Sequence, residues 1–472
     1  MRFLSIFFSL LLSGGCSGRF HSMEPSTRTP KLYERTDFTV LLTADYRNAY
    51  LQEEVALDML IETPSGEERL LPCFWVEGKS GAESRWEARF TPQEPGRYFC
   101  RFRLSEQGEE VARSRAVELS VQPAAEGERG ILHVRDNWTL VYDDGTPFRG
   151  VAENICWESR ANDDSKFFKE LHEQHDRYNY DRMLPLFAEN GGNFIRVWMC
   201  SFNFPIDQHD HFNNLRYTPS DEYYNPSAVE RLDCFVDLCE RLGIHVMLCM
   251  GQGAVPADRE FFNGEPQARR YMNRLRYIVA RWGYSPAIGM WEFFNEIDNI
   301  QHRNPGGSIP AEEIVAWHAR MGKYLKEIDP FGHPVTTSIS HRDLAGLNEG
   351  PSLDINQKHI YRKTAVCIKT FKERVFLTDI CSMFSVCRIS VTINRLPAYT
   401  KLFICIVVII IAFMLRCSCC SFVLRYIDFC HCFTLCRQFN RLWGQCFVIN
   451  FQVCDLSVKS VSDRCQRKYK CR

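Results

Sequence analysis

The stretch Gly289-Met-Trp-Glu-Phe-Phe-Asn-Glu-Ile-Asp298 decides how the larger part of this chain is interpreted. Its apolar body is typical of a strand buried on both faces, and its polar end, Asn295-Glu296, falls where such a strand would leave the sheet. In an α/β barrel, side chains at the C-terminal ends of the parallel strands form the active face. We therefore expect Asn295 and Glu296 to line a site rather than to lie in the core.

Apolar runs and helical periods alternate on both sides of this stretch, from residue 131 to residue 361. Helices are expected over 181–190, 227–242, 265–282 and 312–328. Strands are expected over 148–157, 194–199, 245–250, 288–294, 334–339 and 353–361. This alternation implies a parallel sheet with right-handed crossovers, either doubly wound or an incomplete eight-fold barrel. No Gly-x-Gly-x-x-Gly follows the first strand, so nothing favours dinucleotide binding.

Residues 31–122 have the shorter alternation of antiparallel strands, which is typical of a β-sandwich. Strands are expected over 38–42, 56–61, 69–71, 85–90, 97–104 and 116–121. Cys73 and Cys100 could form a disulfide or remain two buried thiols. Residues 123–130 are expected to be a linker, and Leu140–Phe148 a hairpin with an Asp-Gly turn.

Proton transfer is the chemistry that suits Glu296. A carboxyl that emerges between aromatic neighbours is partly desolvated, which would raise its pKa and keep it protonated near neutrality. A glycosidic oxygen needs such a donor because an alkoxide is a poor leaving group. The adjacent Asn295 amide would hydrogen-bond a sugar hydroxyl. Considered alone, however, the pattern favours an acidic residue in the first turn of a helix.

Taken with its surroundings, the segment resembles the clan of retaining (β/α)8 glycosidases that includes the family-5 cellulases and mannanases. In that clan an Asn-Glu pair ends the fourth strand and the Glu is the acid/base, so the resemblance gives Glu296 this catalytic role. It also implies that Asn295, Arg196, His359, Tyr361 and Trp157 bind substrate. The matching runs are Asn193-Phe-Ile-Arg196-Val-Trp198, His359-Ile-Tyr361 and Glu153-Asn-Ile-Cys-Trp157, in the family's order, and the resemblance covers residues 131–361.

The N-terminal residues carry a second resemblance. The run from Trp86 to Tyr98 looks like the penultimate hairpin of an immunoglobulin-like domain. Residues 31–122 thus resemble the module of unknown function that precedes glycosidase barrels in many bacterial proteins.

Each site residue also has a purely structural interpretation. Arg196 could pair with a barrel carboxylate, Trp157 could belong to the core, and the match at His359 and Tyr361 could be a coincidence. His209-Asp-His211 could suggest a metal site, but no further ligand has suitable spacing, so a solvated loop is favoured. We expect no metal and no other cofactor.

The family pattern breaks at the seventh strand. A retaining glycosidase needs a second carboxylate about 5–5.5 Å from the acid, and the clan supplies it as a Glu that usually precedes glycine. No Glu-Gly or Glu-Phe-Gly occurs after residue 361. The run Phe376-Leu-Thr-Asp379 is the nearest candidate, but aspartate is one methylene shorter. We therefore expect that this chain has no nucleophile.

Composition changes sharply near the same point. Residues 1–354 carry 38 Lys+Arg and 53 Asp+Glu, whereas residues 355–472 carry 19 and 5 together with 14 of the 22 cysteines. A single glycine, Gly444, leaves the tail without the turn chemistry for two further βα units. We expect residues 362–472 to be a non-native or disordered tail, as a reading-frame shift near 362–370 would produce. The net charge of −1 argues against nucleic-acid binding.

The N-terminus has the pattern of an export signal. Arg2 gives a positive start, and Phe3–Leu12 is an apolar stretch too short to span a bilayer. The ending Leu12-Ser-Gly-Gly-Cys16 resembles a bacterial lipoprotein signal in which the cysteine is lipidated; an ordinary cleaved signal is the alternative. Residues 22–30 would then form a short tether. We expect a periplasmic or cell-surface lipoprotein, or an extracellular protein.

The sequence as a whole predicts a multidomain protein with a signal peptide (1–16), an all-β immunoglobulin-like sandwich (31–122) and an incomplete α/β TIM barrel (131–361). The expected function is hydrolysis of O-glycosyl bonds in a polysaccharide or oligosaccharide by a retaining mechanism, lost here if the nucleophile is missing. One alternative is a non-catalytic carbohydrate-binding surface lipoprotein. Another is a membrane-anchored structural protein whose tail, with its apolar run 402–415, spans the bilayer.

Overall fold

The structure of the chain is a computed structural model that describes residues 18–136, 139–157, 179–200, 203–207, 224–251, 257–303, 306–359 and 375–378. Four predicted features lie outside these residues: the lipidation site Cys16, the run His209-Asp-His211, the substrate-binding Tyr361, and the tail 362–472 apart from residues 375–378. Within the described part, no helix combines the length and the apolar character that crossing a bilayer requires.

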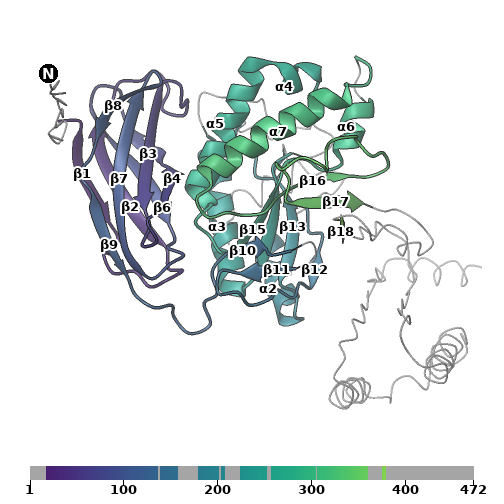
Figure 1. Cartoon of the computed structure of the whole chain (residues 1–472), viewed down its shortest axis with the longest axis horizontal. Coiled ribbons are helices and arrows are strands. Elements are labelled where there is room, and N and C mark those ends of the chain that lie inside the picture. Colours follow the sequence, from purple (N-terminus) through teal and green to yellow (C-terminus); the bar gives the residue numbers. More distant parts are fainter. Residues whose placement is uncertain are drawn as a thin grey trace, which may run out of the picture. The chain divides into compact units, whose positions relative to one another are not determined.

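Residues 20–121 form two antiparallel sheets that pack on one hydrophobic core (Figure 1). The first sheet has the order β1 (Phe20–Pro25), β2 (Thr36–Thr43), β6 (Glu83–Phe90) and β5 (Phe74–Gly78). The second has the order β4 (Glu68–Pro72), β3 (Val55–Glu62), β7 (Gly96–Glu106) and β8 (Glu109–Arg113), with β9 (Val117–Val121) also paired to β7. Phe38 of β2 meets Phe102 of β7 edge to face at 5.7 Å between ring centroids, which joins the two sheets.

The six strands expected in this region are all present, but three expectations about it were wrong. Strand β1 occupies part of the predicted tether, so the first sheet begins before residue 31. Strands β5 and β8 were missed. The run Trp86–Tyr98 is not a hairpin, because β6 and β7 belong to different sheets. Its connection contains two prolines, Pro92 and Pro95, which cannot donate to a ladder, and Gly96, whose φ of +129° few other residues adopt.

Cys73 and Cys100 are both buried free thiols, so the disulfide alternative is not realised. The relation of this β-domain to immunoglobulin-like modules stays a prediction.

Residues 152–378 build a parallel sheet whose seven strands follow one another in chain order (Figure 1). They are β12 (Ala152–Glu153), β13 (Phe194–Trp198), β14 (His245–Cys249), β15 (Ile288–Glu292), β16 (Val335–Ile339), β17 (Ile355–His359) and β18 (Val375–Thr378). A doubly wound sheet reverses its strand order at a switch point, and this sheet does not. The architecture is therefore that of an incomplete TIM barrel, and the doubly wound alternative was wrong.

Helices connect these strands. They are α2 (Asn179–Glu189), α3 (Pro226–Leu242), α4 (Arg259–Asn263), α5 (Glu265–Trp282), α6 (Ile297–Arg303) and α7 (Ala311–Ile328). Of these, α2, α3, α5 and α7 were predicted from the sequence, whereas α4 and α6 were not. The expected hairpin at 140–148 is confirmed by hydrogen bonds from Phe148 N to Leu140 O (2.8 Å) and from Gly145 N to Tyr142 O (2.8 Å). The sheet extends one strand past residue 361, because β18 pairs in parallel with β17 and contains the predicted run Phe376–Thr378. Asp379, which follows it, lies outside the described residues.

A buried charge cluster ties the β-domain to the barrel. Arg276 of α5 donates to Asp58 Oδ1 of β3 (2.5 Å) and to the carbonyl of Leu57 (2.9 Å), while Arg103 donates to Asp58 Oδ2 (2.8 Å). Burial alone would raise the pKa of the Asp58 carboxyl, but the two guanidinium groups outweigh it and hold the pKa below its usual range. Arg276 therefore finds its partners on β3 only when the two parts are docked, whereas Arg103 reaches Asp58 from the same domain.

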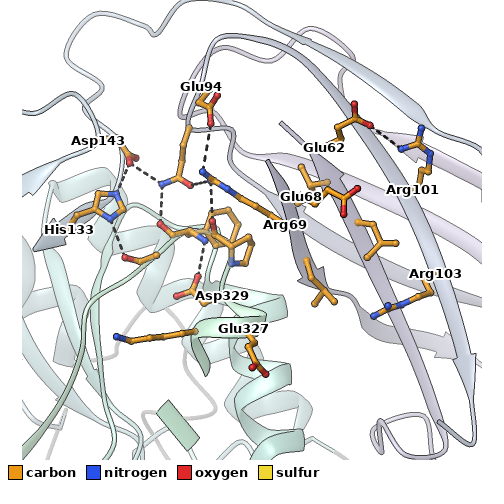
Figure 2. A pocket seen from close by; sticks show the side chains of 18 of the residues that line it. Glu62, Glu68, Arg69, Glu94, Arg101, Arg103, His133, Asp143, Glu327 and Asp329 are labelled. Atoms are coloured by element: carbon orange, nitrogen blue, oxygen red, sulfur yellow. Dashed lines mark hydrogen bonds and ion pairs between the residues drawn. The ribbon is translucent and has the colours of Figure 1, made fainter. Parts of the chain in front are cut away.

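The β-domain and the loop from α7 to β16 also line a cleft of about 970 Å³. Figure 2 shows His133 and Asp143 on one side of this cleft and Arg101 and Arg103 on the other. This loop precedes β16, so the cleft belongs to the end of the barrel opposite to the active face. None of the predicted site residues lines it.

His133 in this cleft has both ring nitrogens next to acceptors. Nε2 lies 2.6 Å from Asp143 Oδ1, and Nδ1 lies 3.1 Å from the carbonyl of Gly332. Only the imidazolium ion can donate from both nitrogens. Burial opposes that charge, but the hydrogen bond and the charge of Asp143 outweigh burial and raise the pKa of His133 above 6.5.

The stabilising effect of His133 should therefore depend on pH. Because its pKa is raised in the folded state, the contribution is complete below the unfolded-state value and is lost as the pH rises through the folded-state value. We expect the difference in unfolding free energy between the parent chain and a His133→Gln variant to be larger at about pH 5.5 than at about pH 8.5. Urea titrations at both pH values measure this; an equal difference would contradict it.

Candidate active site

The innermost feature of the barrel's active face is a buried ion pair between β13 and β15, which lie on either side of β14. Arg196 of β13 donates from Nε to Glu292 Oε2 (2.6 Å) and from Nη2 to Glu292 Oε1 (2.7 Å). The two side chains are 4% and 0% exposed. Burial alone would lower the pKa of Arg196, but the Glu292 carboxylate outweighs burial and raises it. The ion-pair interpretation of Arg196 is thus the one observed.

The same guanidinium positions the next predicted residue. Nη2 of Arg196 donates to Asn295 Oδ1 (2.9 Å), and the Asn295 N–H donates to the carbonyl of Gly251 (2.8 Å). Gly251 follows β14 at a point where a Cβ would lie 2.7 Å from the carbonyl oxygen of Phe293, so no larger residue fits without a shift. Asn295 is therefore fixed from both sides.

Glu296 has a strained backbone at the end of the strand. Its φ of +52° is in the left-handed region, which costs a residue with a Cβ about 1–2 kcal/mol. The Glu296 N–H donates to Ser338 Oγ (2.9 Å), and that hydroxyl also lies 3.2 Å from the carbonyl of Phe294. Ser338 on β16 thus holds the turn that directs Glu296 away from the line of its own strand.

Both carboxylate oxygens of Glu296 are held by side chains. Oε1 lies 2.9 Å from Nδ1 of His359, and Oε2 accepts from Nδ2 of Asn299 at 2.6 Å. Glu296 is 14% exposed at its side chain, whereas His359 is fully buried. The acid is thus anchored at its inner side while part of it reaches the surface.

His359 is held at both ring nitrogens. Its Nδ1 faces Glu296 Oε1, and the Gln357 amide nitrogen lies 3.2 Å from its Nε2. These contacts fix the plane of the imidazole ring, so His359 orients the Glu296 carboxyl.

Trp157 lies beside this group as one of a pair of tryptophans. Its ring meets that of Trp198 edge to face at 5.0 Å between centroids, and the Arg196 guanidinium lies 5.6 Å from the Trp198 ring centroid. Trp157 is half-buried rather than enclosed in the core. Its role as a sugar platform stays a prediction.

The structure thus brings four predicted residues together, namely Glu296, Asn295, Arg196 and His359, while Trp157 contacts Trp198. Sequence reasoning missed four residues that hold them: Glu292, Ser338, Asn299 and Gln357. A signal existed for Glu292 alone, because an acid inside an apolar strand has to be paired with a cation. In the described ranges, no group of three or more His, Cys, Asp or Glu side chains is placed to bind a metal ion.

The Arg196–Glu292 pair makes a specific prediction. Replacing Arg196 by Met leaves Glu292 as a buried charge without its cation, which should destabilise the fold by about 3–5 kcal/mol. The double variant Arg196→Met/Glu292→Gln should recover most of this loss. Chemical denaturation of the single and double variants tests the pair; a double variant less stable than Arg196→Met would contradict it.

Comparison with known proteins agrees with this geometry. Residues 160–339 match the family model described as cellulase (glycosyl hydrolase family 5). This part of the barrel is thus similar in sequence to the family-5 glycoside hydrolases. The matched region includes Arg196, Glu292, Asn295 and Glu296 and ends with β16.

Two individual proteins extend the comparison of this family-5-like barrel. A protein assigned as mannan endo-1,4-beta-mannosidase A-2 of Aspergillus terreus (strain NIH 2624 / FGSC A1156) is 26% identical over 139 residues, which is 26% of this chain and 33% of that protein. The chain thus matches about a third of that relative's length. A crystal structure from Bacteroides vulgatus ATCC 8482, classed as a glycoside hydrolase, has a TM-score of 0.51 at 16% identity and covers 71% of this chain and 60% of that chain. It supports the fold alone.

Proposed function

We propose that the family-5-like barrel acts on the O-glycosyl bonds of a polysaccharide or oligosaccharide, with Glu296 as the general acid/base. The observation that supports this is the placement of one carboxyl. Glu296 leaves the C-terminal end of β15 on a strained residue, held by Ser338, His359 and Asn299 from three other elements. Catalytic groups in barrels occupy this end of the strands.

The geometry suits proton transfer in both directions. The contacts with His359 and Asn299 hold the carboxyl through one side chain on each oxygen. A carboxyl placed in this way can carry a proton and give it to the bridging oxygen of a glycoside. In a retaining mechanism it then accepts a proton from the attacking water. Arg196 and Asn295 provide a fixed, polar wall beside it.

β-1,4-Mannan is the substrate to test first, because the Aspergillus terreus relative is a mannan endo-1,4-beta-mannosidase by name. Because only 139 residues are aligned with this relative, mannan and other β-linked glycans should be tested side by side. Oligosaccharides of both types fit the same proposal.

A retaining mechanism also requires a second carboxylate as the nucleophile, and the sequence offers no clear candidate for it. Glu292 cannot supply it, because both its oxygens accept from Arg196 and it is fully buried. After residue 361 the chain contains one glutamate, Glu373, which precedes β18 instead of following it. This observation favours a second candidate function, a surface protein that binds carbohydrate without cleaving it.

Replacing Glu296 by Gln separates these functions. A catalytic Glu296 predicts that release of reducing ends from β-1,4-mannan, or of phenol from aryl glycosides, falls at least about 100-fold, because general acid catalysis is lost. An exposed glutamate, changed by Glu349→Gln, serves as the control. Activity unaffected by Glu296→Gln would remove the assignment. Binding of mannooligosaccharide without turnover by the parent chain would establish the carbohydrate-binding function instead.

We also propose that the protein is exported and anchored through a lipid on Cys16. The motif Leu12-Ser-Gly-Gly-Cys16 supports this. Changing Cys16 to Ser should move the protein from the detergent phase to the aqueous phase in a bacterial expression host, since a lipid-only anchor is lost. Partition of the variant with the detergent would instead support an anchor elsewhere in the chain.

A further inference from the structure

The loop between β2 and β3, residues 44–54, brings the β-domain into contact with the middle of α5. The Gln52 N–H donates to Asn273 Oδ1 (2.9 Å), and Asn273 Nδ2 donates to Glu53 Oε2 (3.0 Å). Asn273 is 5% exposed. A buried amide is costly unless its donor and its acceptor both find partners. The β2–β3 loop provides one partner for each, so this contact is specific as well as buried.

Tyr50 adds an aromatic contact from the same loop. Its ring meets that of Tyr224 edge to face at 5.1 Å between centroids, and Tyr224 stacks on Tyr277 of α5 at 3.7 Å. The Tyr224 hydroxyl donates to the carbonyl of Asn273 (3.0 Å). Tyr224 belongs to the connection between β13 and α3, which starts at the active face. The β-domain therefore touches one of the connections that leave this face, in addition to α5.

Arg274, the next residue of α5, holds two segments at the active face. Its Nη1 donates to the carbonyl of Met250 (2.9 Å), and its Nε lies 2.9 Å from Asp207 Oδ2. Met250 directly follows β14, and Asp207 lies in the connection after β13. The Arg274 side chain is 10% exposed, so these contacts form in a largely water-free environment, where hydrogen bonds are stronger. One guanidinium thus ties together the ends of two neighbouring strands.

The segment that Arg274 holds is the one that positions Asn295. Gly251 follows Met250, and its carbonyl accepts from the Asn295 N–H (2.8 Å). The two carbonyls belong to neighbouring residues joined by a planar peptide, so holding the first limits the movement of the second. Asn295 in turn directly precedes Glu296 in the chain. A displaced β14 end would therefore shift the residue beside the acid.

We propose that the β2–β3 loop, with Asn273 and Arg274, forms a support that positions Asn295 and the connection after β13. The β-domain then contributes to the barrel's site from outside the barrel. Asn273 and Arg274 are positioning residues, because each acts on the site through another residue. The support is a property of the fold, whereas its effect on saccharide binding rests on the proposed function.

Hydrogen exchange at the Asn295 N–H tests the support without any ligand. This amide is protected by its hydrogen bond to the end of β14, and local opening exposes it. In Arg274→Met and in Asn273→Ala, it should exchange about tenfold faster than in the parent chain, which corresponds to the loss of about one hydrogen bond. Arg69→Met is the matched control, since it removes a contact of the β-domain with the Pro330 carbonyl (3.2 Å) at the opposite end of the barrel.

The control separates positioning from a general loss of stability. Arg69→Met should lower the melting temperature, as Asn273→Ala does, and still leave the exchange of the Asn295 amide unchanged. An amide that exchanges as slowly in Arg274→Met as in the parent would overturn the support. Equal acceleration in all three variants would overturn it as well, because these contacts would then act only through overall stability.

Saccharide binding measures the consequence for the site. The Glu296→Gln chain is titrated calorimetrically with mannopentaose, alone and with either Tyr50→Ala or Arg69→Met added. Tyr50→Ala should weaken binding about tenfold and Arg69→Met should not. Equal affinity of the Tyr50→Ala chain would overturn the contribution of the β-domain to the site. If Glu296→Gln itself binds no saccharide, the proposed function is contradicted, while hydrogen exchange still decides whether the support exists.

Discussion

The buried pair of Arg196 and Glu292 is the interaction on which the active face depends. Two charges removed from water cost several kcal/mol each, and only bidentate geometry with further hydrogen bonds offsets that cost. Here the fork of the guanidinium matches both carboxylate oxygens, and Nη2 also binds Asn295. The pair joins β13 to β15 across β14, so the relative heights of three strands are fixed where they reach the site.

Above this pair, the site is organised by contacts that cross from strand to strand. Glu296 sits on β15's end with a left-handed backbone, yet its N–H is bound from β16 and its carboxyl from β17. A strained residue persists only when its surroundings hold it. The acid is therefore placed by its neighbours, His359 among them, rather than by its own segment.

The β-domain and the barrel share a buried carboxylate where they meet. Asp58 of β3 is bound by Arg103 of its own sheet and by Arg276 of α5. In a separate contact, His133 and Asp143 bridge to the loop before β16. That second contact lies at the end of the barrel opposite to the active face.

The sequence alone was enough to place the longer helices and six strands of the barrel, because continuous apolar runs and 3.6-residue periods are local properties of the chain; the short helices α4 and α6 were missed. It was also enough to single out Asn295, Glu296, Arg196 and His359, each of which stands near the end of a strand. It could not show that Arg196 binds Glu292, that Asn299 and Ser338 hold the acid, or that β6 and β7 separate into two sheets. Most of these contacts join residues dozens of positions apart in the sequence. Contacts over such distances produce no periodic pattern of apolar and polar residues. Only the folded chain, by closing parallel strands in register, decided which buried charge meets which partner and which hydroxyl meets the acid.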